Sequence, residues 1–92
     1  MSESNNSPQT VSKVVSVGTT ATLLVGKNPS VGRTLLVRNN GAATIYVGAK
    51  GVTTSNGFPI AAGGTLVFEA GSALYGIVAA STVDVRVLEV LP

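Results

Sequence analysis

The chain is organised as short apolar runs separated by turn signals. From Arg33 onward, apolar and β-branched runs of about five to seven residues alternate with Asn-Gly, Gly-Gly, Gly-Ser and Ser-Thr breaks. No stretch has the periodicity of an amphipathic helix. This pattern is typical of a small all-β domain, and we expect an antiparallel β-sandwich or jelly-roll-like barrel of seven to eight strands.

Alternation along each run predicts the strands and their buried faces. The first run places Val11, Val15 and Val17 on one face and Ser12, Val14 and Ser16 on the other. The predicted strands span residues 11–17, 21–25, 34–38, 43–47, 65–69, 74–80 and 83–90, with a short edge strand in the polar segment 50–57. The side chains expected to face inward are Leu35, Val37, Ile45, Val47, Leu66, Phe68, Ile77, Val85 and Val87.

Asn39-Asn40-Gly41 predicts a hairpin between residues 34–38 and 43–47, because Asn and Gly tolerate positive φ. A two-residue loop would set apolar side chains of one strand against polar ones of the other. A three-residue loop with a bulge at Gly41 pairs Leu35 with Ile45 and gathers the apolar residues on one face. Since a slip of one residue reverses the faces, the pattern favours the longer loop.

Residues 1–10 form a polar arm, and residues 11–92 form a single β-sandwich domain. The arm is either a segment that becomes ordered on a partner or a solubilising tail, since it cannot bury enough apolar surface to fold alone. Residues 26–32 contain a proline between two glycines and either cross between sheets or project toward a partner. The start at Met1 and the end at Pro92, just past the last strand, favour an independent small protein.

Composition points to a surface rather than a reaction centre. The 92 residues include no His, Cys or Trp, so neither a histidine base, a thiol nucleophile nor a zinc site is possible. The acids Glu69, Asp84 and Glu89 alternate with apolar residues and are interpreted as solvent-facing, while Glu3 lies in the arm. The glycines match no phosphate-binding loop. We therefore expect no enzymatic activity, no cofactor and no metal.

The net charge of +2 comes from six basic residues that are scattered singly along the chain. Nucleic-acid-binding proteins concentrate Lys and Arg on one face, so we expect no nucleic-acid partner. No apolar run approaches the roughly 20 residues of a membrane-spanning helix, and the N-terminus lacks the apolar region of a signal peptide. A chain rich in Val, with 45% hydrophobic residues and no cysteine, favours self-association, and we expect a homo-oligomer, most simply a trimer.

Several motifs occur in a fixed order: Leu36-Val-Arg-Asn-Asn-Gly41, Ile45-Tyr-Val-Gly48, Gly57-Phe-Pro-Ile60, Leu74-Tyr-Gly-Ile77 and Val85-Arg-Val-Leu-Glu89. In this order they resemble the small β-sandwich virion structural proteins of tailed bacteriophages, over roughly residues 31–90. The resemblance implies a head-decoration or head-fibre role, with no catalytic residues. It implies as partner the major capsid protein or another virion protein, and a location in the virion, assembled in the host cytoplasm. A trimer would also match the threefold positions of an icosahedral shell.

The predicted contacts with that partner come from the arm, two polar loops and two strands. A tail or adhesin-type module that recognises a glycan or a host surface is the alternative, with Tyr46 and Tyr75 as the available aromatics. Two tyrosines in strands also fit ordinary sheet packing. The predicted partner-binding residues are Asn5, Asn6, Pro8, Gln9, Thr10, Lys27, Arg38, Tyr46 and Lys50.

Overall fold

The computed structural model describes residues 9–28 and 33–91 of the chain. All regular secondary structure in these residues is β-strand, which confirms the predicted all-β class. The short edge strand expected within residues 50–57 lies just after them, at residues 58–60. The eight strands of the described residues are β1 (Gln9–Val17), β2 (Thr22–Val25), β3 (Thr34–Asn39), β4 (Ile45–Gly48), β5 (Phe58–Ile60), β6 (Thr65–Phe68), β7 (Leu74–Ile77) and β8 (Val83–Leu91).

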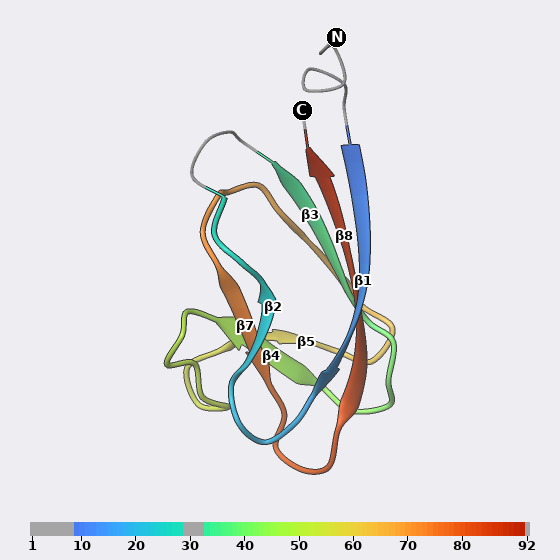
Figure 1. The fold of residues 1–92 in the computed structure, drawn as a ribbon. Helices are drawn as coiled ribbons and strands as arrows, with labels where there is room; N and C mark the ends of the chain where they lie inside the picture. The colour runs from blue at the N-terminus through green and yellow to red at the C-terminus, as the bar shows by residue number, and fades with distance from the viewer. Residues whose placement is uncertain (1–8, 29–32, 92) are drawn as a thin grey trace, which may run out of the picture.

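The strands form two four-stranded sheets that pack face to face (Figure 1). The first sheet has the order β1-β8-β3-β6 and the second the order β2-β7-β4-β5, with all neighbouring strands antiparallel. Apart from β4 and β5, consecutive strands lie in different sheets, while residues 29–32 of the segment between β2 and β3 lie outside the described part. This is the strand order of an eight-stranded jelly roll, so the predicted fold class is confirmed.

The predicted hairpin between residues 34–38 and 43–47 is wrong. β3 pairs with β6 and β8 in the first sheet, whereas β4 pairs with β5 and β7 in the second. Residues 40–44 therefore form a corner between sheets rather than a turn within one. The predicted faces are nevertheless right, because alternation along a strand determines which side chains point inward and contains no information about the neighbouring strand.

The core lies between the two sheets and consists of small and branched apolar side chains. Leu66 and Phe68 of β6, an edge strand, are half-buried and pack against it. The predicted inward residues that are buried are Leu35, Val37, Ile45, Val47, Val85 and Val87. The buried residues that complete the core are Val17, Leu24, Val25, Ile60, Leu74, Val78 and Val83.

Ile77 does not belong to the core, which corrects the sequence-based prediction. It is half-buried on the outer face of the second sheet, while the inward positions of β7 are Leu74 and Gly76. A Cβ on Gly76 would lie 3.3 Å from Leu24 Cδ1, so the missing side chain makes room for Leu24 in the core. Residues 74–80 are apolar on both faces of the strand, and one inward position is a glycine. The sequence pattern therefore does not show which face is buried.

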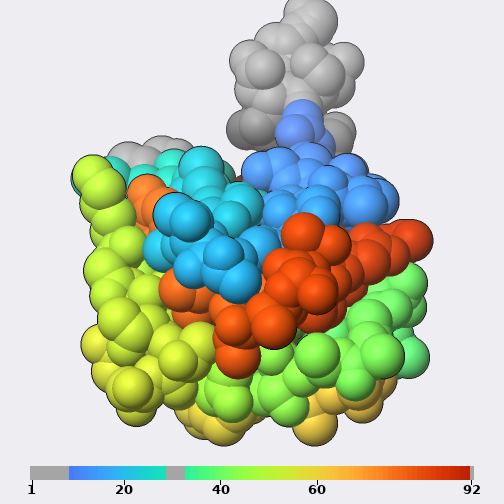
Figure 2. Space-filling model, turned by 90° about the horizontal axis from the view of Figure 1, so that it is seen from below, coloured from blue at the N-terminus to red at the C-terminus, as the bar shows by residue number. Residues whose placement is uncertain are grey.

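Three connections close one end of the sandwich. Figure 2 views this end and shows the β1–β2 connection (blue), the β7–β8 connection (orange-red) and the β3–β4 connection (green) side by side. The Val78 amide donates to the Gly18 carbonyl at 3.0 Å. A Cβ on Gly41 would lie 2.7 Å from Val83 Cγ1, so this corner can approach β8 only because residue 41 has no side chain.

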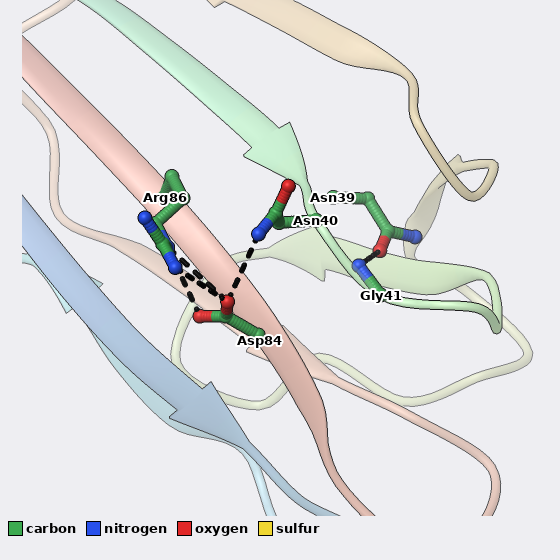
Figure 3. Close-up of polar contacts among 5 residues, drawn as sticks. All are labelled: Asn39, Asn40, Gly41, Asp84 and Arg86. Atoms are coloured by element: carbon green, nitrogen blue, oxygen red, sulfur yellow. Dashed lines mark hydrogen bonds and ion pairs between the residues drawn. The ribbon is translucent and has the colours of Figure 1, made fainter.

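Asn39 is a polar residue with no exposed surface at the end of β3. Its side-chain nitrogen donates to the carbonyls of Ala43 at 2.7 Å and Ile60 at 2.9 Å. Its Oδ1 accepts from the Gly41 amide at 3.0 Å (Figure 3). The Gly63 amide, at a φ of 79°, donates to the Asn39 carbonyl at 2.8 Å. One residue thus holds the β3–β4 corner and the β5–β6 connection together.

We expect Asn39→Ala to lower the free energy of unfolding by about 2–4 kcal/mol, because two carbonyls and one amide lose their partner in or near the core. Asn40→Ala removes an exposed side chain with one hydrogen bond, and it should change the free energy of unfolding by no more than about 0.5 kcal/mol. Urea denaturation of both variants measures the difference. Equal stabilities would contradict the role assigned to Asn39.

Candidate interaction surface

Arg33 and Glu89 form an ion pair inside the protein. Arg33 Nη1 lies 2.7 Å from Glu89 Oε2, and the two side chains are 1% and 12% exposed. The guanidinium also donates to the carbonyls of Ala70 at 3.0 Å and Ser72 at 2.6 Å. The prediction that Glu89 faces solvent is therefore wrong, since the Arg33 side chain covers its carboxylate. The pair attaches the β6–β7 connection to the first sheet.

Asp84 and Arg86 form a second ion pair on the outer surface of β8 (Figure 3). Arg86 Nη2 lies 2.9 Å from Asp84 Oδ2, and the Asn40 side-chain amide donates to the same oxygen at 3.0 Å. The hydrogen bond from Arg86, followed by that from Asn40, lowers the pKa of the Asp84 carboxyl. Asp84 in turn raises the pKa of Arg86. The positive charge of Arg86 is thus countered within the protein.

The outer face of the first sheet exposes large apolar side chains. Val14 is 67% exposed, Val67 59% and Val90 37%, although these residues lie on three different strands. A contiguous apolar face of this kind commonly marks an interaction site. Strand pairing places the outward residues in rows, of which one is Val14, Arg86, Arg38 and Thr65 and the next is Ser12, Leu88, Leu36 and Val67.

An open groove of about 440 Å³ lies over this face, and we call it the first-sheet groove. All four strands of the sheet contribute to its lining. Its lining combines cationic with apolar side chains and contains no acidic residue. The lining residues used below are Val14, Leu36, Arg38, Arg86 and Leu88.

A second hollow of about 280 Å³ opens between the two sheets where β5 and β6 form their edges. Phe58 at its rim is 59% exposed, and Leu66 and Phe68 are half-buried along one side. The surface of this hollow is almost entirely apolar. It is an opening into the core rather than a polar binding site.

The structure separates four of the predicted partner-binding residues. Arg38 is exposed on the outer face of the first sheet, whereas Tyr46 is half-buried on the outer face of the second. Lys27 and Lys50 are exposed in the connections after β2 and β4 and line neither hollow described above. These residues therefore do not form one site.

The predicted attachment arm is only partly covered by the structure. Asn5, Asn6 and Pro8 lie outside the described residues. Gln9 and Thr10, assigned to the arm from the sequence, instead begin β1, and they pair with the C-terminal end of β8. Their exposed polar side chains have no apolar alternation, but their backbones continue the ladder with β8, and strand formation depends on the backbone.

Sequence reasoning missed most of the first-sheet groove. Val14 and Arg86 share a row with Arg38 only through the order β1-β8-β3, which the sequence pattern does not contain. One signal was available in the sequence. Val14 is an apolar residue on the otherwise polar face of the first strand.

No protein-family model matches the sequence, and no curated protein has a significantly similar sequence. Within residues 9–28 and 33–91, no helix is long and apolar enough to cross a membrane. The same residues contain no group of three or more His, Cys, Asp or Glu side chains that would hold a metal ion. The function is therefore inferred from the fold and its surfaces.

We expect Glu89→Gln to lower the free energy of unfolding by about 2–4 kcal/mol, since it leaves the buried charge of Arg33 without a counterion. Glu69→Gln is the matched control, because it removes the same charge from an exposed residue and should change the stability by no more than about 0.5 kcal/mol. Urea denaturation compares the two variants. A Glu89→Gln protein as stable as the control would contradict the structural role of the pair.

We expect the Asp84 carboxyl to titrate below the range of an ordinary aspartate, and Arg86→Gln to raise its pKa toward that range. Because the pKa is lower in the folded state than in the unfolded state, the carboxylate stabilises the fold above the unfolded-state pKa. This contribution is lost as the pH falls through the folded-state pKa. The stability difference between the natural protein and Asp84→Asn should thus disappear in acid. Carbon-detected NMR titration of the carboxyl group measures the pKa, and an unchanged pKa in Arg86→Gln would contradict its cause.

Proposed function

We propose that this protein is a non-enzymatic virion structural protein of a tailed bacteriophage, either a capsid decoration (cement) protein or a head-fibre protein that binds the assembled shell. It acts as a homotrimer that contacts the major capsid protein or another virion protein, and it joins the particle in the host cytoplasm. The observation that supports this proposal most directly is the uncovered apolar outer face of the first sheet, with Val14 and Val67 more than half exposed.

That face has the properties of a docking surface. Its side chains project from paired strands, so their positions are set before a partner arrives and little conformational freedom is lost on contact. Among the described residues, every buried side-chain polar atom has a hydrogen-bond partner, which favours a rigid platform. Covering the exposed valines contributes about 25 cal/mol for each Å² of apolar area removed from water.

When many copies bind one shell, their small individual contacts together stabilise the shell strongly. A protein that binds the assembled shell and not its free subunits shifts the equilibrium toward the shell by mass action. Many copies, each with a small interface, therefore reinforce the shell together. The jelly-roll architecture is common among proteins that build viral shells, and the ordered motifs between residues 31 and 90 resemble phage virion proteins.

The second sheet offers a specific observation in favour of the alternative, a tail or adhesin-type module. Tyr46 and Tyr75 both lie on its outer face, and Tyr75 pairs with Gly48, two residues along the strand from Tyr46. Tyr46 and Tyr75 are thus diagonal neighbours on this face, and Gly48 beside them has no side chain. Flat aromatic surfaces of this kind suit the apolar faces of sugars.

The test is to mix purified protein with shells that lack it and to measure saturable binding and the heat resistance of the shells. We expect Val67→Lys to weaken binding by about tenfold or more, because a charge replaces an apolar contact. Leu23→Lys is the matched control, since it makes the same kind of change at a residue that is 47% exposed on the second sheet. This control should bind shells as the natural protein does.

Two outcomes would contradict the proposal in different ways. Equal losses from Val67→Lys and Leu23→Lys would mean that the first sheet is not the contact face. An absence of shell binding together with measurable affinity for a glycan or a host surface would place the protein in the adhesin class.

A further inference from the structure

We infer that the first-sheet groove binds an acidic segment of another protein, in which a carboxylate side chain and an apolar side chain lie on the same face. This inference concerns the ligand chemistry that the groove selects and does not depend on the virion role. It rests on three observations, namely an uncompensated cation, the arrangement of charged and apolar rows, and the shortage of free acids in this chain.

The uncompensated cation is Arg38. Strand pairing sets Arg38 directly opposite Arg86, so two guanidinium groups share one row of the sheet. Like charges in this position repel each other. Arg86 is paired with Asp84, whereas Arg38 has no hydrogen bond or ion pair to any described residue. A carboxylate between these cations would supply the missing counterion.

The neighbouring row is apolar on β8, β3 and β6, with Ser12 at its β1 end. Leu36 and Leu88 are paired with each other and half-buried, and Val14 extends the apolar surface at the β1 side of the groove. This row lies two residues along the strands from the arginine row, which is about 6.6–6.8 Å in β-geometry. An extended segment carries its own same-face side chains at that spacing. A Glu at position i over the arginine row therefore places an apolar residue at i+2 over the leucine row.

A second copy of this chain is a poor source of the carboxylate. The sequence contains four acidic residues, and Glu3 is outside the described part. Of the other three, Asp84 is paired with Arg86 and Glu89 with Arg33, which leaves Glu69. A different protein can therefore supply the complementary charge more readily than a second copy of this chain. The volume of about 440 Å³ fits a few side chains of such a segment.

The experiment titrates the isotope-labelled protein with capped five-residue peptides and follows its backbone amides by NMR. The test peptide has the sequence Thr-Glu-Thr-Leu-Thr, and two controls replace its Glu with Gln or with Lys. We expect the Glu peptide to bind with a dissociation constant on the order of 1 mM and to shift the amides around Val14, Arg38 and Arg86. The shifts should weaken as salt is raised from about 20 to 200 mM, because the charges are exposed. The controls should cause no shifts there.

Variants identify the charges that matter. Arg38→Gln should weaken binding of the Glu peptide roughly two- to fivefold, which is the range for an exposed ion pair. Lys50→Gln changes the net charge equally outside the groove and should leave the affinity unchanged. Asp84→Asn should strengthen binding, since it frees Arg86 from its internal counterion. The amide spectrum of each variant also verifies that it is folded.

Several results would overturn the inference. Absence of shifts in the groove, or equal shifts with the Lys peptide, would remove the requirement for a carboxylate. Equal effects of Arg38→Gln and Lys50→Gln would mean that the peptide responds only to net charge. Equal binding of a short thymidine oligonucleotide would assign the groove to polyanions in general. Amide shifts in the groove that depend on the concentration of the free protein would make a second copy the occupant.

Discussion

The two sheets share a single layer of apolar side chains, and the rest of the structure depends on keeping that layer closed. The layer is made almost entirely of Val, Leu and Ile, and no disulfide supports it. Each connection that crosses between the sheets brings backbone polar groups to the margin of this layer, where they need partners. Asn39 supplies them at the β3 corner, and Arg33 with Glu89 supplies them beside the β6–β7 connection. The hydrogen bonds of Asn39 and of the Arg33–Glu89 pair thus satisfy backbone groups that lie at the margin of a thin core.

The sequence predicts strands and faces well because both depend on local alternation. Leu35, Val37, Ile45 and Val47 face inward as expected, even though the hairpin that was meant to join them does not form. The prediction of this hairpin was wrong because an Asn-Asn-Gly sequence fits a corner between two sheets as well as a turn within one sheet. The prediction that Ile77 faces inward was wrong because residues 74–80 are apolar on both faces of the strand. The local sequence determines which face of a strand is buried, whereas the pairing of strands depends on the whole set of strands.

The candidate surface was less predictable for the same reason. Arg38 was identified from the sequence as an exposed cation, but its importance comes from facing Arg86, which lies in a distant part of the chain. Tyr46 also points outward from its strand, but it is half-buried and lies on the opposite side of the sandwich. The interior positions of Arg33 and Glu89 have no sequence signature, because each looks like an ordinary charged residue at a strand. The surface is formed by residues that become neighbours across strands, and the pattern along a single strand does not show which residues these are.

β8 lies between β1 and β3, although it follows both in chain order. While the chain is being synthesised, β1 has no neighbouring strand in the described residues until β8 is complete, so the backbone amides and carbonyls along this edge stay unpaired. The first sheet therefore closes late, in one cooperative step that joins residues far apart in sequence, which is a slow kind of folding. Before that step, the nascent chain carries unpaired strand edges that invite aggregation. Completion of β8 thus protects the described part of the chain from pairing with other copies of itself.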